Sequence, residues 1–341
     1  MRICSKCFAA PTWTLNAQDK PDFGHRCDFC GDASGLTWEA IAWREAIKLL
    51  VSLYEPKADG MSIGSLVQKD WGIFRETAAS SIDEFLTAGD PGGSLEPGRL
   101  YGRRPHGEDD PLHSWRRFSD EIRSENRYHL NAILDMAILE RAFLESTRII
   151  AKSTKMYRAR THSDPVSIIP SRMKAPPREK ASGGRANPPG IPYLYLAMEK
   201  ETCIAETRAR EHMYISIATL SVKQRLELLD LTSISPPDFF VDNPGESLAI
   251  HDYLVELGQQ LSRPVRTADA AVDYIPTQYL CEYAKSISLD GVIYSSSLYA
   301  GGVNVVLFEQ NVMAVNRFVE LHKVDGVNVT TSVMAHIQGR S

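Results

Sequence analysis

The hydrophobic positions divide the chain into two parts with different periodicities. From Thr37 to about Ile150, apolar residues recur three or four positions apart, which is the spacing of one buried helix face. Proline and polar clusters interrupt the pattern and end the helices. The predicted helices are one from Thr37 that ends before Pro56, then 62–69, 74–86 and a long one over about 112–151. We therefore predict a small helical bundle here.

The second half of the chain alternates short apolar runs with helical segments. Runs rich in aromatic and β-branched residues predict strands. The expected strands are 157–160, 191–197, 213–220, 225–230, 291–294 and 304–308, and the expected helices are 199–212, 245–260 and 277–288. No Gly-x-Gly-x-x-Gly opens a helix after a strand, so we predict a mixed α+β domain and not a doubly wound one.

Composition and charge are those of an ordinary globular protein. The 341 residues are 43% hydrophobic and 24% charged, which allows two domains. The net charge of −5 gives no support for general nucleic-acid binding. No apolar run approaches the ~18 residues that span a bilayer, and the first residues lead into no signal-peptide core. We expect a cytoplasmic protein without membrane contact.

Four of the six cysteines fall in a metal-binding pattern. Cys4, Cys7, Cys27 and Cys30 form C-x2-C-x19-C-x2-C. Thiolates two residues apart on a tight turn both reach one tetrahedral Zn²⁺ at about 2.3 Å, and a second such turn closes the shell. Two disulfides are the alternative, which the absent signal peptide disfavours. The pattern predicts a structural zinc knuckle over 1–36. The other two cysteines lie in apolar settings typical of small buried residues, not nucleophiles.

Four short motifs in the second half carry the candidate chemistry. They are Tyr157-Arg158-Ala159-Arg160, Gly183-Gly184-Arg185-Ala186-Asn187, Glu206 within 204–208, and Ser296 within 294–297. Paired guanidiniums suit a diphosphate, because each planar fork donates two charge-assisted hydrogen bonds. A carboxylate suits a positive charge elsewhere on the same ligand. The combination indicates a dinucleotide whose glycosidic bond is loosened, with NAD as the substrate.

The ordered set of motifs resembles the RES domain, which is named for its Arg, Glu and Ser. The resemblance runs from about Met156 to Phe308 and ends in the segments 290–296 and 302–308. It implies a fold similar to ADP-ribosyltransferase toxins. It also implies that NAD is consumed by hydrolysis or phosphorolysis, or that ADP-ribose is transferred to a protein.

The same resemblance implies residue roles. The NAD-binding residues are Arg158, Arg185, Asn187, Tyr195 and Ser296, and the catalytic ones are Arg158, Glu206 and Ser296. Tyr195 would pack on the nicotinamide side, and Ser296 would either bond the carboxamide or orient the glutamate. Ala186 stands where the family commonly has Trp or Phe, a departure that removes a stacking ring and widens the expected pocket.

The helical region is similar to a HEPN-like domain found before some RES domains. HEPN nucleases place an Arg and a His a few residues apart on one helix, and Arg123 and His129 have that spacing. The alternative interpretation is a solvated helix face with i,i+4 charge pairs. An RNase or nucleic-acid-binding regulator is therefore the competing function class, and sensing, dimerisation or restraint of the catalytic domain are the other roles for this region.

Together these patterns predict a zinc knuckle over 1–36, a helical domain over 37–152, a RES catalytic domain over 153–325 and a tail or edge strand over 326–341. The predicted function is an NAD-degrading toxin or defence effector, with protein ADP-ribosylation as the runner-up. The resemblance implies an antitoxin partner, and restraint by the N-terminal domain or by self-association stays open.

Overall fold

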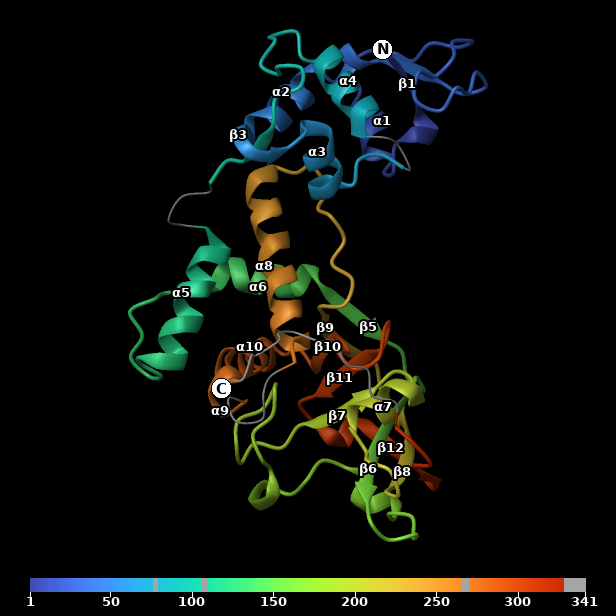
Figure 1. Ribbon diagram of the computed structural model, residues 1–341, viewed down its shortest axis with the longest axis vertical. Coiled ribbons are helices and arrows are strands. Elements are labelled where there is room, and N and C mark those ends of the chain that lie inside the picture. Colours follow the sequence, from blue (N-terminus) through green and yellow to red (C-terminus); the bar gives the residue numbers. More distant parts are fainter. Residues whose placement is uncertain (76–78, 106–109, 265–269, 328–341) are drawn as a thin grey trace, which may run out of the picture. The chain divides into compact units, whose positions relative to one another are not determined.

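The computed structural model describes residues 1–75, 79–105, 110–264 and 270–327 (Figure 1). The chain divides into two compact units. Unit 1 contains Met1–Phe118, Ala132–Ile138 and Ile234–Leu254, and unit 2 contains Ser119–Asn131, Leu139–Ser233 and the chain from Val255 onward. Among the described residues, no helix combines the length and apolar character needed to cross a membrane.

Unit 1 is built from short elements around an aromatic core. In chain order these are β1 (Arg2–Cys4), η1 (Ser5–Cys7), α1 (Thr12–Leu15), β2 (Thr37–Glu39), η2 (Ala40–Trp43), α2 (Arg44–Ser52), β3 (Tyr54–Met61), α3 (Ile63–Trp71), α4 (Ala79–Gly89) and β4 (Tyr101–Arg103). The strands form two antiparallel pairs, β1 with β2 and β3 with β4. The helix predicted from Thr37 begins too early, because Thr37–Glu39 form β2 and only η2 with α2 follow. The predicted helices at 62–69 and 74–86 overlap α3 and α4.

Large rings and three cysteines share the core of unit 1. Trp43 is fully buried, and its ring centroid lies 5.0 Å from that of Phe8. Cys4, Cys7 and Cys27 are buried in the same apolar cluster. The cysteine turns are therefore part of the packing of this unit and not an appendage to it.

The pairing of β3 with β4 was not expected from the helical pattern of this region. Asp70 of α3 is 1% exposed and accepts hydrogen bonds from the Tyr54 hydroxyl at 2.9 Å and from Arg103 Nε at 2.6 Å. Arg103 also pairs with Asp252 of α8 (Pro244–Ser262). A buried carboxylate needs such partners, and they hold both strands against α3.

The long helix predicted over 112–151 is wrong. The chain instead forms α5 (Pro111–Ser124), a loop, α6 (Met136–Glu145) and β5 (Thr147–Ile150). The buried Glu121 carboxylate of α5 accepts hydrogen bonds from the backbone N–H and the side-chain amide of Asn131 in the loop, at 2.8 and 3.0 Å. Asp135 then accepts from the backbone N–H of Ala137 and Ile138, as an N-cap does. These side-chain bonds compete with helix continuation.

Unit 2 is organised by one eight-stranded sheet, whose order is β12-β8-β6-β7-β11-β10-β9-β5 (Figure 1). Its remaining strands are β6 (Lys155–His162), β7 (Leu194–Ala197), β8 (Tyr214–Val222), β9 (Leu226–Asp230), β10 (Gly291–Ser295), β11 (Val303–Leu307) and β12 (Met313–Lys323). Every neighbouring pair is antiparallel except β9 with β10. The predicted mixed α+β fold is confirmed.

The two edge strands, β5 and β12, were not predicted as strands. Of the predicted tail or edge strand over 326–341, the part from residue 328 onward lies outside the described residues. The other predicted strands overlap β6 to β11. Two 3₁₀ turns, η3 (Pro170–Met173) and η4 (Arg178–Lys180), occupy the connection between β6 and β7, and η5 (Gln310–Val312) precedes β12.

Short helices pack on the sheet and set up the site. These are α7 (Lys200–Glu206), α9 (Ala270–Asp273) and α10 (Ile275–Ser286); α7 contacts β6, β7 and β11, and α10 contacts β10. The helix predicted over 199–212 is too long. It ends at Glu206, and Arg208 adopts the left-handed conformation (φ 48°) that closes many helices.

Candidate active site

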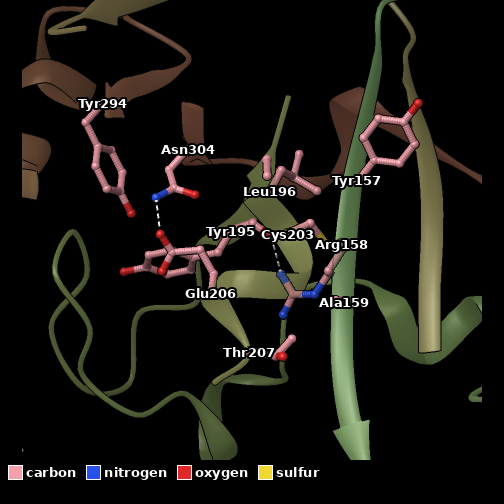
Figure 2. Close-up of a pocket in the computed structure, with 11 residues that line it drawn as sticks. Tyr157, Arg158, Ala159, Tyr195, Leu196, Cys203, Glu206, Thr207, Tyr294 and Asn304 are labelled. Carbon is pink, nitrogen blue, oxygen red and sulfur yellow. Dashed lines mark hydrogen bonds between the residues drawn. The ribbon is translucent and has the colours of Figure 1, made fainter. Parts of the chain in front are cut away.

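A cavity of about 250 Å³ opens in unit 2 where β6, β7, α7, β10 and β11 meet (Figure 2). Its lining combines one guanidinium, one carboxylate, an amide and several aromatic rings. The lining residues are Tyr157, Arg158, Ala159, Tyr195, Leu196, Ala197, Cys203, Glu206, Thr207, Tyr294 and Asn304.

Arg158 brings an unneutralised positive charge to the cavity. Its Nη1 donates a hydrogen bond to the carbonyl of Tyr195 at 2.9 Å, whereas its Nε is buried and has no partner in the described part of the chain (Figure 2). Burial, reinforced by the neighbouring Arg160 cation, lowers the pKa of Arg158 to about 10, so the group is still charged at neutral pH. A buried cation without a carboxylate partner favours an anionic ligand.

Glu206 supplies the negative charge. It is the last residue of α7, and its Oε1 accepts hydrogen bonds from Ser296 Oγ and from Asn304 Nδ2, both at 2.7 Å. Asn304 is 5% exposed on β11, so its amide is fixed by packing. Two donors on one oxygen hold the carboxylate in a single orientation and leave the other oxygen to act on a ligand.

The hydroxyl of Ser296 is fully used within the protein. Its oxygen accepts hydrogen bonds from the backbone N–H of Leu298 at 3.1 Å and of Tyr299 at 3.2 Å. A serine hydroxyl has two lone pairs and one hydrogen, so the hydrogen is left for Glu206. Of the two roles expected for Ser296, this geometry favours orienting the glutamate over bonding a carboxamide.

The Gly-Gly-Arg-Ala-Asn loop positions Tyr195. The Tyr195 hydroxyl donates to Asn187 Oδ1 at 2.6 Å and accepts from the backbone N–H of Ala186 at 3.1 Å. Asn187 is 3% exposed, and its Nδ2 donates to three backbone carbonyls of the same loop. A side chain at Gly184 would place its Cβ 2.5 Å from the Tyr195 hydroxyl, which explains the glycine. Asn187 thus supports the loop and does not line the cavity.

Arg185 does not line the cavity. Its Nη1 donates to the carbonyl of Leu261 at 3.0 Å and to that of Arg263, at the C-terminal end of α8. Its guanidinium also lies 5.6 Å from the Tyr274 ring centroid. The structure therefore does not bring Arg185 together with Arg158 in the lining. Ala186 is fully buried and also outside the lining, so the missing ring does not widen this cavity.

Tyr294 and Asn304 also line the cavity, and Asn304 had no assigned role in the sequence analysis. They face each other as a cross-strand pair of the β10–β11 hairpin. Figure 2 shows the Tyr294 hydroxyl pointing to the same part of the cavity as Glu206. Burial raises the pKa of Tyr294 well above its usual value, so this hydroxyl stays a neutral donor. The hairpin register, had it been derived from the two predicted strands, would have pointed to both residues.

The cysteine motif converges on one point in unit 1. The Sγ atoms of Cys4, Cys7, Cys27 and Cys30 lie within 4.8 Å of one another. The Sγ–Sγ distances are 3.7 Å for Cys4–Cys7, 3.6 Å for Cys4–Cys30 and 3.7 Å for Cys7–Cys27. All four are free thiols and not disulfides. The edge of a tetrahedron with Zn–S bonds of 2.3 Å is about 3.8 Å, so the four residues fit a zinc ion.

Comparison with known proteins identifies the family. The RES domain model matches residues 155–327, and the chain belongs to the RES domain family. Among solved structures, the chain is similar to the crystal structure of the M. tuberculosis MbcT–MbcA toxin–antitoxin complex, with 22% identity over 55% of this chain and 93% of that chain and a TM-score of 0.33. The family assignment rests on the match over 155–327. A search of curated proteins finds no match.

Proposed function

We propose that this protein cleaves the bond between nicotinamide and ribose in NAD, as a glycohydrolase or phosphorylase, and acts as a toxin or defence effector. One observation carries the proposal: the unneutralised guanidinium of Arg158 and the oriented carboxylate of Glu206 line the same cavity. NAD has the complementary pair of charges, an anionic diphosphate and a cationic nicotinamide ring. Membership of the RES domain family supports the same reading.

The cavity residues have different roles in this reaction. When the glycosidic bond breaks, its electron pair leaves with nicotinamide, which becomes neutral, and the ribose acquires oxocarbenium character. The Glu206 carboxylate stabilises that developing positive charge, as carboxylates do in glycosidases. Tyr195 and Tyr294 supply ring faces and a neutral hydroxyl beside the sugar. Ser296 and Asn304 are positioning residues, because they act through Glu206.

Capture of the ribose completes the reaction. Water gives ADP-ribose and releases a proton, whereas phosphate gives ADP-ribose 1″-phosphate. Transfer to a protein side chain is the alternative within the same site. All three routes share the step that Glu206 stabilises, so Glu206 is the residue to test.

The test follows nicotinamide release from NAD by purified wild-type protein and by Glu206→Gln, with and without phosphate. Glutamine keeps the size and one acceptor oxygen but removes the charge, and we expect a loss of at least about 10³-fold in rate. The product identifies the acceptor: ADP-ribose indicates water, ADP-ribose 1″-phosphate indicates phosphate, and labelled protein indicates a side chain. An NAD pool that stays intact with wild-type protein, or equal rates for the two proteins, contradicts the proposal.

The nuclease alternative gains no support from the described residues. The helix α5 ends at Ser124, so Arg123 and His129 do not share a helix as the HEPN arrangement requires. Arg123 instead donates to the carbonyl of Ser119 at 3.0 Å and pairs with Asp120. The alternative interpretation, a solvated helix face with i,i+4 charge pairs, fits only in part, because the Arg123–Asp120 pair is three residues apart and Glu121 is buried.

We propose further that Cys4, Cys7, Cys27 and Cys30 hold one structural Zn²⁺. Four thiolates leave no open coordination position for catalysis. The backbone N–H of Cys4 lies 3.3 Å from Cys27 Sγ, a hydrogen bond that stabilises a thiolate ligand. Bound zinc would cross-link the two turns of this knuckle within the core of unit 1.

An inhibitory partner is also part of the proposal. The similar M. tuberculosis structure is that of a toxin–antitoxin complex. For this chain we propose a cytoplasmic protein that covers the NAD cavity and restrains it, with restraint by unit 1 or by self-association as the alternatives. Expression of the chain alone tests the need for a separate partner, since unrestrained activity would deplete cellular NAD and stop growth.

A further inference from the structure

A second arginine accompanies Arg158 on the same strand. Arg160 lies two residues further along β6, and residues two apart on a strand project from the same face, about 6–7 Å from each other. The Nη2 of Arg160 donates to the carbonyl of Lys174 at 3.0 Å. Its Nε is buried and has no partner in the described part of the chain.

The two guanidiniums form an uncompensated pair of charges. Burial lowers the pKa of Arg160, and the Arg160 cation is one cause of the lowered pKa of Arg158. Among the described residues, each guanidinium is held only by a backbone carbonyl. Other arginines of the chain, such as Arg103 and Arg148, pair with carboxylates. Two adjacent half-buried cations are unfavourable unless an anion joins them.

We propose that Arg160 joins Arg158 in a diphosphate clamp, so that the diphosphate of the dinucleotide lies along β6 between these two side chains. This inference rests on the proposed function, which it deepens.

The size of the cavity agrees with this placement. At about 250 Å³ it is smaller than the pockets of about 300–1,000 Å³ that enclose drug-sized ligands, so it accommodates the nicotinamide and its ribose but not a whole dinucleotide. Arg160 does not line the cavity, whereas Arg158 does. A diphosphate that leaves the cavity past Arg158 therefore meets Arg160 next on the same strand.

Binding of ADP, measured by calorimetry, tests the clamp without requiring catalysis. Arg160→Leu should weaken ADP binding at least about tenfold, because charge-assisted hydrogen bonds are lost. Arg160→Lys keeps the positive charge but loses the planar guanidinium, so its ADP affinity should lie between those of wild type and Arg160→Leu. Arg225→Leu is the control, since Arg225 is exposed and pairs with Glu227 at the start of β9. Circular dichroism and thermal melting confirm that each variant folds.

Kinetics with two substrates add a second measurement. Arg160→Leu should raise KM for NAD at least about tenfold and leave turnover of nicotinamide riboside, which has no phosphate, unchanged. ADP affinity equal to wild type in folded Arg160→Leu overturns the clamp, as does a wild-type protein that fails to bind ADP at millimolar concentration. If Arg160→Leu loses ADP binding but wild-type protein leaves NAD intact, the clamp stands and the proposed reaction fails.

Discussion

At the scale of single residues, the hydrogen bonds of the Ser296 hydroxyl determine which role it can have. It accepts from two turn amides and donates to Glu206, so no capacity is left for a ligand. We predict that Ser296→Ala lowers kcat for NAD by about ten- to a hundredfold, the cost of one hydrogen bond to a charged group, and leaves KM within about twofold. Steady-state kinetics separates the two constants.

The exposed neighbour provides the control for this substitution. Ser297→Ala removes a hydroxyl from the same turn without touching Glu206, so it should leave both constants unchanged. A Ser296→Ala variant whose KM rises while kcat stays at the wild-type value would show that the hydroxyl contacts substrate directly. That result would support the other expected role, in which Ser296 bonds the carboxamide of nicotinamide.

Cys203 lies in the cavity lining but is poorly suited to be a nucleophile. Burial raises the pKa of its thiol to about 12, so only about one molecule in 10⁴ carries a thiolate at pH 8. We predict that iodoacetamide at pH 8 does not label Cys203 in the folded protein, and that reactivity increases as pH rises toward 12. Peptide mass spectrometry measures this, with urea-unfolded protein as the positive control. Rapid labelling at pH 8, or loss of NAD cleavage in Cys203→Ala, would contradict it.

At the scale of elements, local patterns predicted the strands that surround the site and failed where distant side chains decide the outcome. The strands β10 and β11 carry aromatic and β-branched runs that need no outside partner to be recognised. The long helix failed because Glu121 and Asn131 bond to each other across a loop. The pattern of apolar positions does not reveal such a bond.

The same argument applies to the two arginine motifs. That Arg158 reaches a cavity with Glu206 follows from the ordered motifs of the family. Arg185 donates to carbonyls of Leu261 and Arg263, far away in the sequence, and no motif indicates where its side chain goes. Packing in three dimensions, not spacing along the chain, decided which arginine is left with an unpaired donor.

Arg185 is therefore predicted to stabilise an element junction. It caps the C-terminal carbonyls of α8, and its own carbonyl accepts from Thr277 Oγ1 at 2.6 Å. Arg185→Lys should lower the stability of the protein by about 1–3 kcal/mol, because lysine cannot reproduce the fork, while ADP affinity stays within about threefold of wild type. Urea unfolding and calorimetry measure the two effects. Unchanged stability together with a tenfold loss of ADP affinity would show that Arg185 binds the diphosphate.

At the scale of the whole molecule, the two units can be observed separately. All five tryptophans, Trp13, Trp38, Trp43, Trp71 and Trp115, belong to unit 1. The cavity residues all belong to unit 2. Tryptophan fluorescence thus follows unfolding of unit 1, and nicotinamide release follows the integrity of the site in unit 2.

This separation gives a test of the zinc site. Because three of the four cysteines are in the core of unit 1, loss of the metal should loosen that core. We predict that Cys7→Ser, or treatment with a chelator, lowers the midpoint of the tryptophan transition by roughly 10 °C or more. Cys281→Ala removes a buried thiol from unit 2 and should leave this transition in place. Elemental analysis should find one zinc per wild-type chain and none in Cys7→Ser. Protein that lacks zinc yet melts like wild type would show that the four thiols pack as ordinary core residues.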